Sequence, residues 1–259
     1  MTPLFFVLAA IAGYLLGSIP FGLVLTRAAG LGDIRTIGSG NIGATNVLRT
    51  GRKDIALATL VLDAAKAGLA LLIVKALAGW LGGDALGDNT AYQLGLVAGG
   101  AAFIGHCYPV WLGFKGGKGV ATFFGVLFAG LWPIGLIAGI TWLAVATMFR
   151  MSSLAALCAA AIAPVMALVA SFGWEQIAFT FALAVLIFWR HRTNIARILA
   201  GTEPRIGDKK KESDEQTAPA PAAAAEPTPA PEPVMEPTPE PDPEPAPEPE
   251  PEAVAQPEP

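Results

Sequence analysis

Long apolar stretches separated by short loops constrain this chain most. A bilayer core about 30 Å thick is crossed by roughly 20 apolar helical residues. Only 15% of the residues are charged, whereas soluble domains are about a quarter charged. We therefore expect an all-α polytopic membrane protein with about seven transmembrane helices. Their expected bounds are 4–26, 55–80, 90–112, 119–131, 133–149, 152–171 and 174–190. The segment 119–131 is short, which leaves open whether it spans fully.

Lysine and arginine are concentrated in alternate loops. They occur throughout 27–54, at Lys115 and Lys118, at Arg150, and again from Arg190 onward. The intervening loops "GWLGGDALGDNT", "GLWP" and "SFGWE" contain no basic residue. Basic loops face the cytoplasm, and seven spans place every basic loop on one side. This predicts an external N-terminus and a cytoplasmic C-terminus.

The composition changes abruptly near residue 207. The segment beyond it is dominated by proline, glutamate and alanine and holds no aromatic residue. Such a segment buries too little apolar surface to offset its ordering entropy. We expect a transmembrane domain over 1–206 and a disordered cytoplasmic tail over 207–259.

A few polar or reactive side chains fall inside the predicted spans. Asp63 and Lys66 are three residues apart, so they share a helix face and can pair. Ionisable groups inside a membrane are functional by default, but a neutralised structural pair fits equally well. Lys75 is expected to extend toward the outer interface. Cys107 and Cys158 are expected to be small core residues.

The first polar segment on the predicted cytoplasmic side is "IGSGNIGATNVLR" (37–49). It approaches the P-loop pattern, but Ala44 stands where that pattern requires lysine. Successive glycines still allow backbone N–H groups to converge on an anion, and arginine offers a planar fork suited to phosphate. A plain interhelical loop is the alternative. The candidate anion-binding residues are Gly38, Ser39, Gly40, Asn41, Gly43, Thr45, Asn46 and Arg49.

The second segment, "GFKGGKGVAT" (113–122), places two lysines before a predicted helix. Cations at a helix N-terminus oppose the helix dipole, and a bound phosphate would reverse that effect. For Lys115, contact with lipid headgroups or a role in setting topology is an equal alternative. For Lys118 we favour a ligand. The candidates are Lys115, Gly116, Gly117, Lys118 and Gly119.

The third segment is "RHRTNIARILAGTE" (190–203). His191 and Asn194 are three residues apart and share a face if the helix continues. We interpret them as site residues, with a simple polar cap as the alternative. The H-x-x-x-x-D signature of many lipid acyltransferases is absent, because Trp111 and Ala196 stand where His106 and His191 would need an aspartate.

These segments, together with "GSIPFG" (17–22) and "GHCYPVW" (105–111), resemble in order and spacing the motifs of the PlsY family. That family comprises the bacterial acyl-phosphate-dependent glycerol-3-phosphate acyltransferases. The resemblance covers about residues 1–206. It implies a seven-span fold in the bacterial plasma (inner) membrane, with its motifs facing the cytoplasm. It also implies transfer of an acyl group from acyl phosphate to sn-glycerol 3-phosphate, giving 1-acyl-sn-glycerol 3-phosphate and phosphate, the first step of phospholipid synthesis.

Carried over by motif, the polar site comprises Ser39, Arg49, Lys118, His191 and Asn194. Ser39, His191 and Asn194 are expected to be catalytic. Either His191 or the departing phosphate takes the proton of the glycerol hydroxyl, and the sequence leaves both open. The expected partners are the two substrates, the lipid bilayer and a soluble enzyme that supplies acyl phosphate. No metal, cofactor or nucleic acid is expected.

Two other function classes compete with an enzyme. A transporter for an organic phosphate would share the glycine hinges and broken helices, but it predicts internal repeats and charges at the membrane midplane. A non-catalytic scaffold would use the acidic tail and leaves the glycine-rich loops unexplained.

Overall fold

The computed structural model describes residues 2–207, without the side chains of 82–86. The tail predicted over 207–259 therefore lies, apart from Gly207, outside the described residues. The described part is helical. Its α-helices are α1 (Thr2–Gly17), α2 (Phe21–Ala28), α3 (Ala44–Val47), α4 (Lys53–Cys107), α5 (Val120–Gly130), α6 (Trp132–Phe149), α7 (Ser152–Val169), α8 (Trp174–Arg190) and α9 (Arg192–Leu199). Short 3₁₀ turns are η1 (Ile34–Thr36), η2 (Leu48–Thr50) and η3 (Val110–Leu112).

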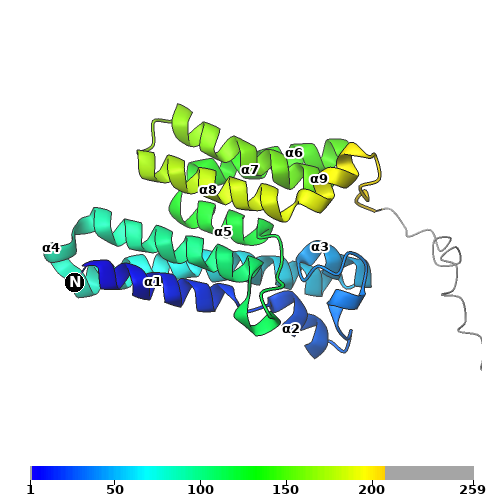
Figure 1. Ribbon diagram of the computed structural model, residues 1–259, viewed down its shortest axis with the longest axis horizontal. Helices are drawn as coiled ribbons and strands as arrows, with labels where there is room; N and C mark the ends of the chain where they lie inside the picture. The colour runs from blue at the N-terminus through cyan, green and yellow to red at the C-terminus, as the bar shows by residue number, and fades with distance from the viewer. Residues whose placement is uncertain (1, 208–259) are drawn as a thin grey trace, which may run out of the picture. The chain divides into compact units, whose positions relative to one another are not determined.

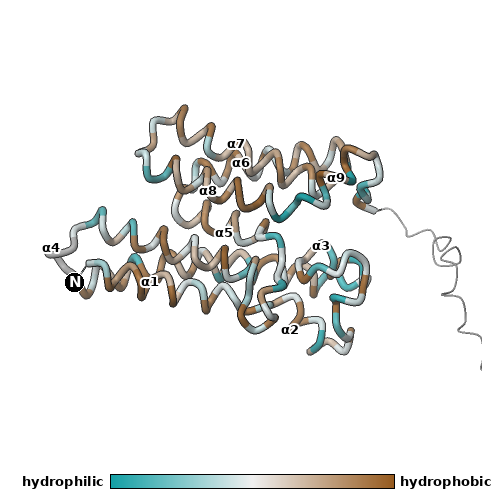
Figure 2. The backbone as a smooth tube through the Cα atoms, in the orientation of Figure 1, coloured by the Kyte–Doolittle hydropathy of each residue, from teal (hydrophilic) through white to brown (hydrophobic). Residues whose placement is uncertain are grey.

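The long helices pack largely in chain order. Contacts join α1 to α4, α4 to α5, α5 to α6, α6 to α7 and α7 to α8. In Figure 1, α1 and α4 form one layer, α6, α7 and α8 form another, and α5 lies between them. The short helices α2, α3 and α9 gather at one end of this bundle. That end is also where hydrophilic residues concentrate, whereas the long helices are hydrophobic along most of their length (Figure 2).

The helix α4 contains the predicted span 55–80 and most of the predicted span 90–112, whose last residues lie beyond Cys107. It reverses direction near Gly87, whose φ of +67° is a left-handed value that glycine adopts readily. Its two halves then pack against each other. A side chain at Gly95 would approach the carbonyl oxygen of Leu71 to 2.9 Å, so glycine is needed where the halves meet.

Within residues 2–207, five stretches are long and apolar enough to cross a membrane. The other two predicted spans correspond to α5, with 11 residues, and α8, with 17. At 1.5 Å per residue α5 is about 16 Å long, shorter than a bilayer core. The five long stretches are Thr2–Ala28, Lys53–Leu81, Gly87–Leu112, Trp132–Phe149 and Ser152–Val169.

Small residues let α1 approach α4 closely. A side chain at Gly13 would collide with the backbone of Ala98, and one at Gly17 with that of Ala102. Helices in a membrane associate by such close backbone packing, because lipid supplies no hydrophobic drive between them. The same device joins α4 to α5, where Gly125 lies against the backbone of Ala64.

The predicted span 4–26 is broken rather than continuous. The helix α1 ends at Gly17, α2 begins at Phe21, and Pro20 precedes α2. The break frees backbone carbonyls, which need partners away from water. Lys66 Nζ donates to the carbonyl oxygen of Ile19 at 2.8 Å, so a buried ammonium completes this break.

The predicted ion pair between Asp63 and Lys66 is confirmed. Asp63 and Lys66 pair, with 2.9 Å between Oδ1 and Nζ. Lys75 lies over the ring of Tyr92, 5.6 Å from its centroid. Cys107 is buried, whereas Cys158 is only partly buried.

Candidate active site

Asn46 organises the first glycine-rich segment. Its side chain is 2% exposed, and its Nδ2 lies 2.9–3.0 Å from the carbonyl oxygens of Ile34, Ile37 and Asn41. Its Oδ1 accepts a hydrogen bond of 3.0 Å from the backbone N–H of Ser39. Buried polar groups need such partners. Asn46 therefore holds residues 37–46 (the Asn46 loop) in shape instead of facing a ligand.

Two glycines give the Asn46 loop its turn. Gly38 and Gly40 have φ values of +57° and +67°, which side-chain-bearing residues rarely adopt. A side chain at Gly38 would also meet the guanidinium of Arg49 at 2.7 Å. The loop therefore turns against the side chain of Arg49, and Ser39 between the two glycines is exposed.

The second segment, residues 113–119 (the Lys118 loop), folds back onto the end of α4. The backbone N–H of Gly116 donates to the carbonyl oxygen of Cys107 at 3.2 Å, and that of Gly117 donates to His106 at 3.0 Å. Neither glycine has room for a side chain. The loop leads directly into α5, so Lys118 lies at the N-terminal end of that helix, as the sequence predicted.

Arg190, at the end of α8, holds the other side of the Lys118 loop. Its Nη2 donates to the carbonyl oxygen of Gly116 at 2.8 Å, and its Nε donates to that of Gly117 at 3.0 Å. Its guanidinium lies over the ring of Tyr108, 4.9 Å from the centroid. A lysine could not make this two-pronged contact. From the sequence alone, Arg190 was only one basic residue among several.

Lys118 connects the second segment to the third. Its half-buried ammonium donates a short hydrogen bond to Asn194 Oδ1. Burial lowers the pKa of Lys118 to about 8, and Arg197, Arg190 and Arg49 add to the decrease while Glu203 opposes it. This concentration of positive charge around a buried lysine would be relieved by a bound anion.

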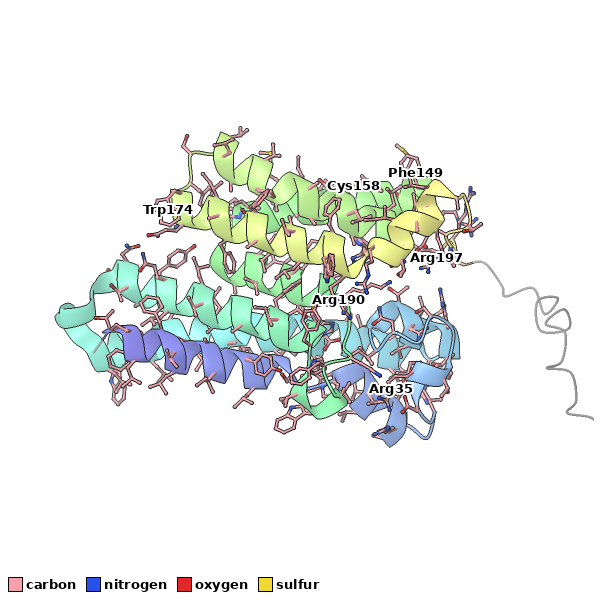
Figure 3. All side chains as sticks on the ribbon, in the orientation of Figure 1. Arg35, Phe149, Cys158, Trp174, Arg190 and Arg197 are labelled. Carbon is pink, nitrogen blue, oxygen red and sulfur yellow. The ribbon has the colours of Figure 1, made fainter. Side chains whose placement is uncertain are left out.

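Glu203 organises the third segment, although it was not among the site residues predicted from the sequence. Its Oε1 accepts from Asn194 Nδ2 at 2.6 Å, and its Oε2 accepts from Arg197 Nε at 2.7 Å. An amide that donates to a carboxylate must direct its oxygen elsewhere, here toward Lys118. The carboxylate thereby orients Asn194. Arg190 and Arg197 lie near each other at the α8–α9 end of the bundle, opposite Trp174 (Figure 3).

His191 lies at the junction of α8 and α9. The helix is interrupted there rather than continuous, yet His191 and Asn194 are both buried, at 2% and 4% exposed. The ring Nδ1 lies 2.8 Å from the carbonyl oxygen of Ile187. A carbonyl only accepts, so Nδ1 carries the proton and Nε2 keeps its lone pair in the neutral ring. Burial lowers the pKa of His191 to about 4, and the charge of Lys118 contributes.

A polar pocket of about 220 Å³ lies where the three segments meet. The Asn46 loop supplies hydroxyl, amide and backbone groups, and the other two segments supply cations. Successive backbone groups with converging cations are what a phosphate site needs. The lining residues are Ser39, Gly40, Asn41, Gly116, Lys118, Arg190, Arg192 and Thr193.

Some predicted site residues lie outside the lining of this polar pocket. Thr45 and Lys115 are exposed, and Gly43 precedes α3 with open space around it. Gly119 has a φ of +81° and adjoins the ring of Phe103, so its role is to permit the turn. Within residues 2–207, no three His, Cys, Asp or Glu side chains gather as metal ligands would.

Comparison with known proteins shows the family. The family model for glycerol-3-phosphate acyltransferase matches residues 7–201. A glycerol-3-phosphate acyltransferase from Maricaulis maris is 60% identical over 215 residues, covering 82% of this chain and 93% of that protein. One from Rhodospirillum rubrum is 62% identical over 203 residues, covering 78% and 91%.

Two crystal structures of PlsY, an integral membrane glycerol 3-phosphate acyltransferase, have the same fold. The glycerol 3-phosphate form has a TM-score of 0.69 at 37% identity and covers 78% of this chain and 96% of its own. The lysophosphatidic acid form has a TM-score of 0.67 at 36% identity. Because these relatives are enzymes, the transporter and scaffold alternatives are set aside. This chain belongs to the glycerol-3-phosphate acyltransferase family and is an integral membrane acyltransferase.

Proposed function

We propose that this protein transfers an acyl group from acyl phosphate to sn-glycerol 3-phosphate, giving 1-acyl-sn-glycerol 3-phosphate and inorganic phosphate. The observation that carries the proposal is the polar pocket, where Lys118, Arg190 and Arg192 converge beside the Asn46 loop. A reaction between two phosphate-bearing substrates requires several cations at one place. The related crystal structures are a glycerol 3-phosphate form and a lysophosphatidic acid form, which correspond to one proposed substrate and the proposed product.

An activated donor suits the groups that are present. Ser39 Oγ contacts the amide oxygen of Asn46 at 3.3 Å rather than an imidazole, so it lacks the base that a serine nucleophile requires. An acyl phosphate is a mixed anhydride and needs no covalent enzyme intermediate. The glycerol hydroxyl oxygen attacks the acyl carbon, the carbon–oxygen bond to phosphate breaks, and phosphate departs. Ser39 and nearby backbone N–H groups would stabilise the developing oxyanion.

His191 fits the role of orienting the attacking hydroxyl. Its neutral ring offers Nε2 as an acceptor, because Nδ1 donates to Ile187. With a pKa near 4 it is a weak base, whereas a phosphate monoester binds its second proton with a pKa near 6. We infer that His191 accepts the hydroxyl hydrogen bond and that the departing phosphate finally holds the proton.

An apolar groove supports a substrate with an acyl chain. It has a volume of about 990 Å³, lies between α7 and α8, and extends from Trp174 past Phe181 to Arg192. Arg192 also lines the polar pocket. An acyl chain in this groove would therefore carry its phosphate to the cationic end.

The direct test uses purified protein in detergent, acyl phosphate and isotopically labelled glycerol 3-phosphate. We expect labelled lysophosphatidate to form. Parallel reactions with acyl-CoA and with acylated carrier protein should give far less product. Efficient use of either alternative donor, with none from acyl phosphate, would overturn the proposal.

We further propose seven membrane-crossing segments, with the N-terminus outside and the polar pocket on the cytoplasmic side of an inner membrane. Trp80, Trp132 and Trp174 are strongly exposed, as aromatic residues at a membrane interface are, and Trp174 lies far from Arg190 (Figure 3). The predicted span 119–131 would then cross with its short helix α5 between the other helices, and irregular backbone at membrane depth is tolerated where protein surrounds it.

Single cysteines test this topology. In a chain with Cys107→Ala and Cys158→Ala, we expect Asp88→Cys to react with a membrane-impermeant maleimide in intact cells. Thr36→Cys should react only after the membrane is opened. Both positions are exposed and lie outside the polar pocket. Reaction of both from the same side would exclude the arrangement.

The pH dependence of kcat/KM should report Lys118. Its pKa is lowered to about 8, so the charged form is lost as the pH rises through 8, and kcat/KM should fall there. Lys118→Arg should remove this alkaline limb, because guanidinium stays charged far above that pH. A limb at the same pH in the arginine variant would assign the titration to another group.

A further inference from the structure

Three polar side chains lie buried among the membrane helices behind the polar pocket. Asp63 and Lys66 come from the first half of α4, and His106 comes from its last turn. They are 2%, 3% and 4% exposed. None of them lines the polar pocket. Burying such groups is expensive unless they are neutralised and hydrogen-bonded, so this buried polar set calls for a role.

The ammonium of Lys66 contacts three different groups. Its Nζ lies 2.9 Å from Asp63 Oδ1, 3.1 Å from His106 Nδ1 and 2.8 Å from the carbonyl oxygen of Ile19. An ammonium has three donors and no acceptor, so His106 Nδ1 accepts and Nε2 carries the ring proton. The ring of His106 is therefore locked in one orientation, and the break between α1 and α2 is tied to the same point.

The far edge of that ring supports the Lys118 loop. A side chain at Gly117 would overlap His106 Nε2 and approach Cε1 to 2.8 Å. The φ of Gly117 is not in the left-handed region, so its backbone conformation would accept alanine. The His106 ring is thus the reason for glycine at 117. Because Lys118 is the next residue, the contact between Gly117 and the His106 ring also fixes the position of the Lys118 backbone.

We propose that Asp63, Lys66 and His106 form a positioning set that fixes the Lys118 loop, and through it the ammonium of Lys118 beside Asn194. His106 supports the loop from the membrane side, and Arg190 holds its carbonyl oxygens from the α8 side. The inference rests on the proposed role of Lys118 as a phosphate clamp. Its physical basis is that a small displacement of a catalytic group lowers the rate steeply.

A suppressor cycle tests the contact. Gly117→Ala should lower kcat/KM about 100-fold, since a misplacement near 1 Å has an effect of that order. In His106→Asn, the amide oxygen can replace Nδ1 as the acceptor for Lys66, while the ring edge under Gly117 is removed. The double variant Gly117→Ala/His106→Asn should therefore recover at least about tenfold relative to Gly117→Ala.

The neighbouring glycine supplies a matched control. A side chain at Gly116 would collide with the backbone oxygen of His106 and with Pro109 Cδ. His106→Asn removes neither atom, so Gly116→Ala should gain nothing from it. Equal rescue of both alanine variants, no rescue of Gly117→Ala, or an undiminished rate in Gly117→Ala alone would each overturn the inference.

Two further readouts separate positioning from folding. In His106→Asn, the alkaline limb of kcat/KM assigned to Lys118 should shift, which a loss of stability alone would not produce. The same cycle measured by thermal unfolding in detergent reports the contact without any acyl transfer. If the wild-type protein fails to transfer acyl groups, the proposed function falls, and the unfolding cycle still decides whether His106 supports Gly117.

Discussion

Replacing Lys118 with methionine will lower acyl transfer by roughly 30- to 1,000-fold. Methionine keeps an apolar stem of similar length and removes the charge. The lost contact is a charge-assisted hydrogen bond to phosphate in a partly desolvated site, worth about 2–4 kcal/mol in the transition state. Lys118 lines the polar pocket and lies at the N-terminal end of α5, where a phosphate would offset both charge and dipole. Initial rates at saturating and limiting glycerol 3-phosphate measure the effect.

Lys115→Met is the matched control for this prediction. Lys115 is exposed and does not line the polar pocket, so its variant should stay within about threefold of wild type. Lys118→Arg should recover activity only in part, because the wide guanidinium does not replace a point charge. A folded Lys118→Met enzyme with a near wild-type rate would show that the Lys118 loop carries no phosphate clamp.

Replacing Glu203 with glutamine will lower the rate by roughly 10- to 100-fold. Glutamine has the same shape and keeps one acceptor, but it weakens two charge-assisted hydrogen bonds, each worth about 1.5–3 kcal/mol. The amide of Asn194 then loses the partner that directs its oxygen toward Lys118. The negative charge of Glu203 also raises the pKa of Lys118, against the lowering effect of the surrounding arginines. In Glu203→Gln, kcat/KM should fall, and its alkaline limb should move to lower pH.

Glu175→Gln is the control for the glutamate. Glu175 also accepts a hydrogen bond from an amide, Gln93 Nε2 at 2.7 Å, but it lies in the first turn of α8, far along the helix from Arg190. Its variant should keep a rate within about threefold of wild type. Arg197→Gln should be intermediate, since Arg197 is the more exposed partner of Glu203. An unchanged rate in stable Glu203→Gln protein would show that Glu203 does not position the site residues.

The sequence by itself determined where most of the long helices lie. Predicted spans such as 133–149 and 152–171 match α6 and α7 within two residues at each end, because length and hydropathy alone decide which segments can be buried in lipid. It also identified the three polar segments that meet at the polar pocket. Ser39 and Lys118, which line that pocket, were selected in this way, since glycine-rich loops with hydroxyl groups and cations have few other uses at a membrane surface.

Only the tertiary structure decided what each polar side chain does. Asn46 looked like a ligand and is instead the centre of its own loop, whereas Glu203 and His106 were passed over and hold the site in place. Lys118 and Asn194 are 76 residues apart in the chain yet share a hydrogen bond. Burial follows from local composition, but a hydrogen-bond partner depends on which distant backbone and side-chain groups the packed helices bring together. Such a pairing therefore cannot be predicted from any single segment of the chain.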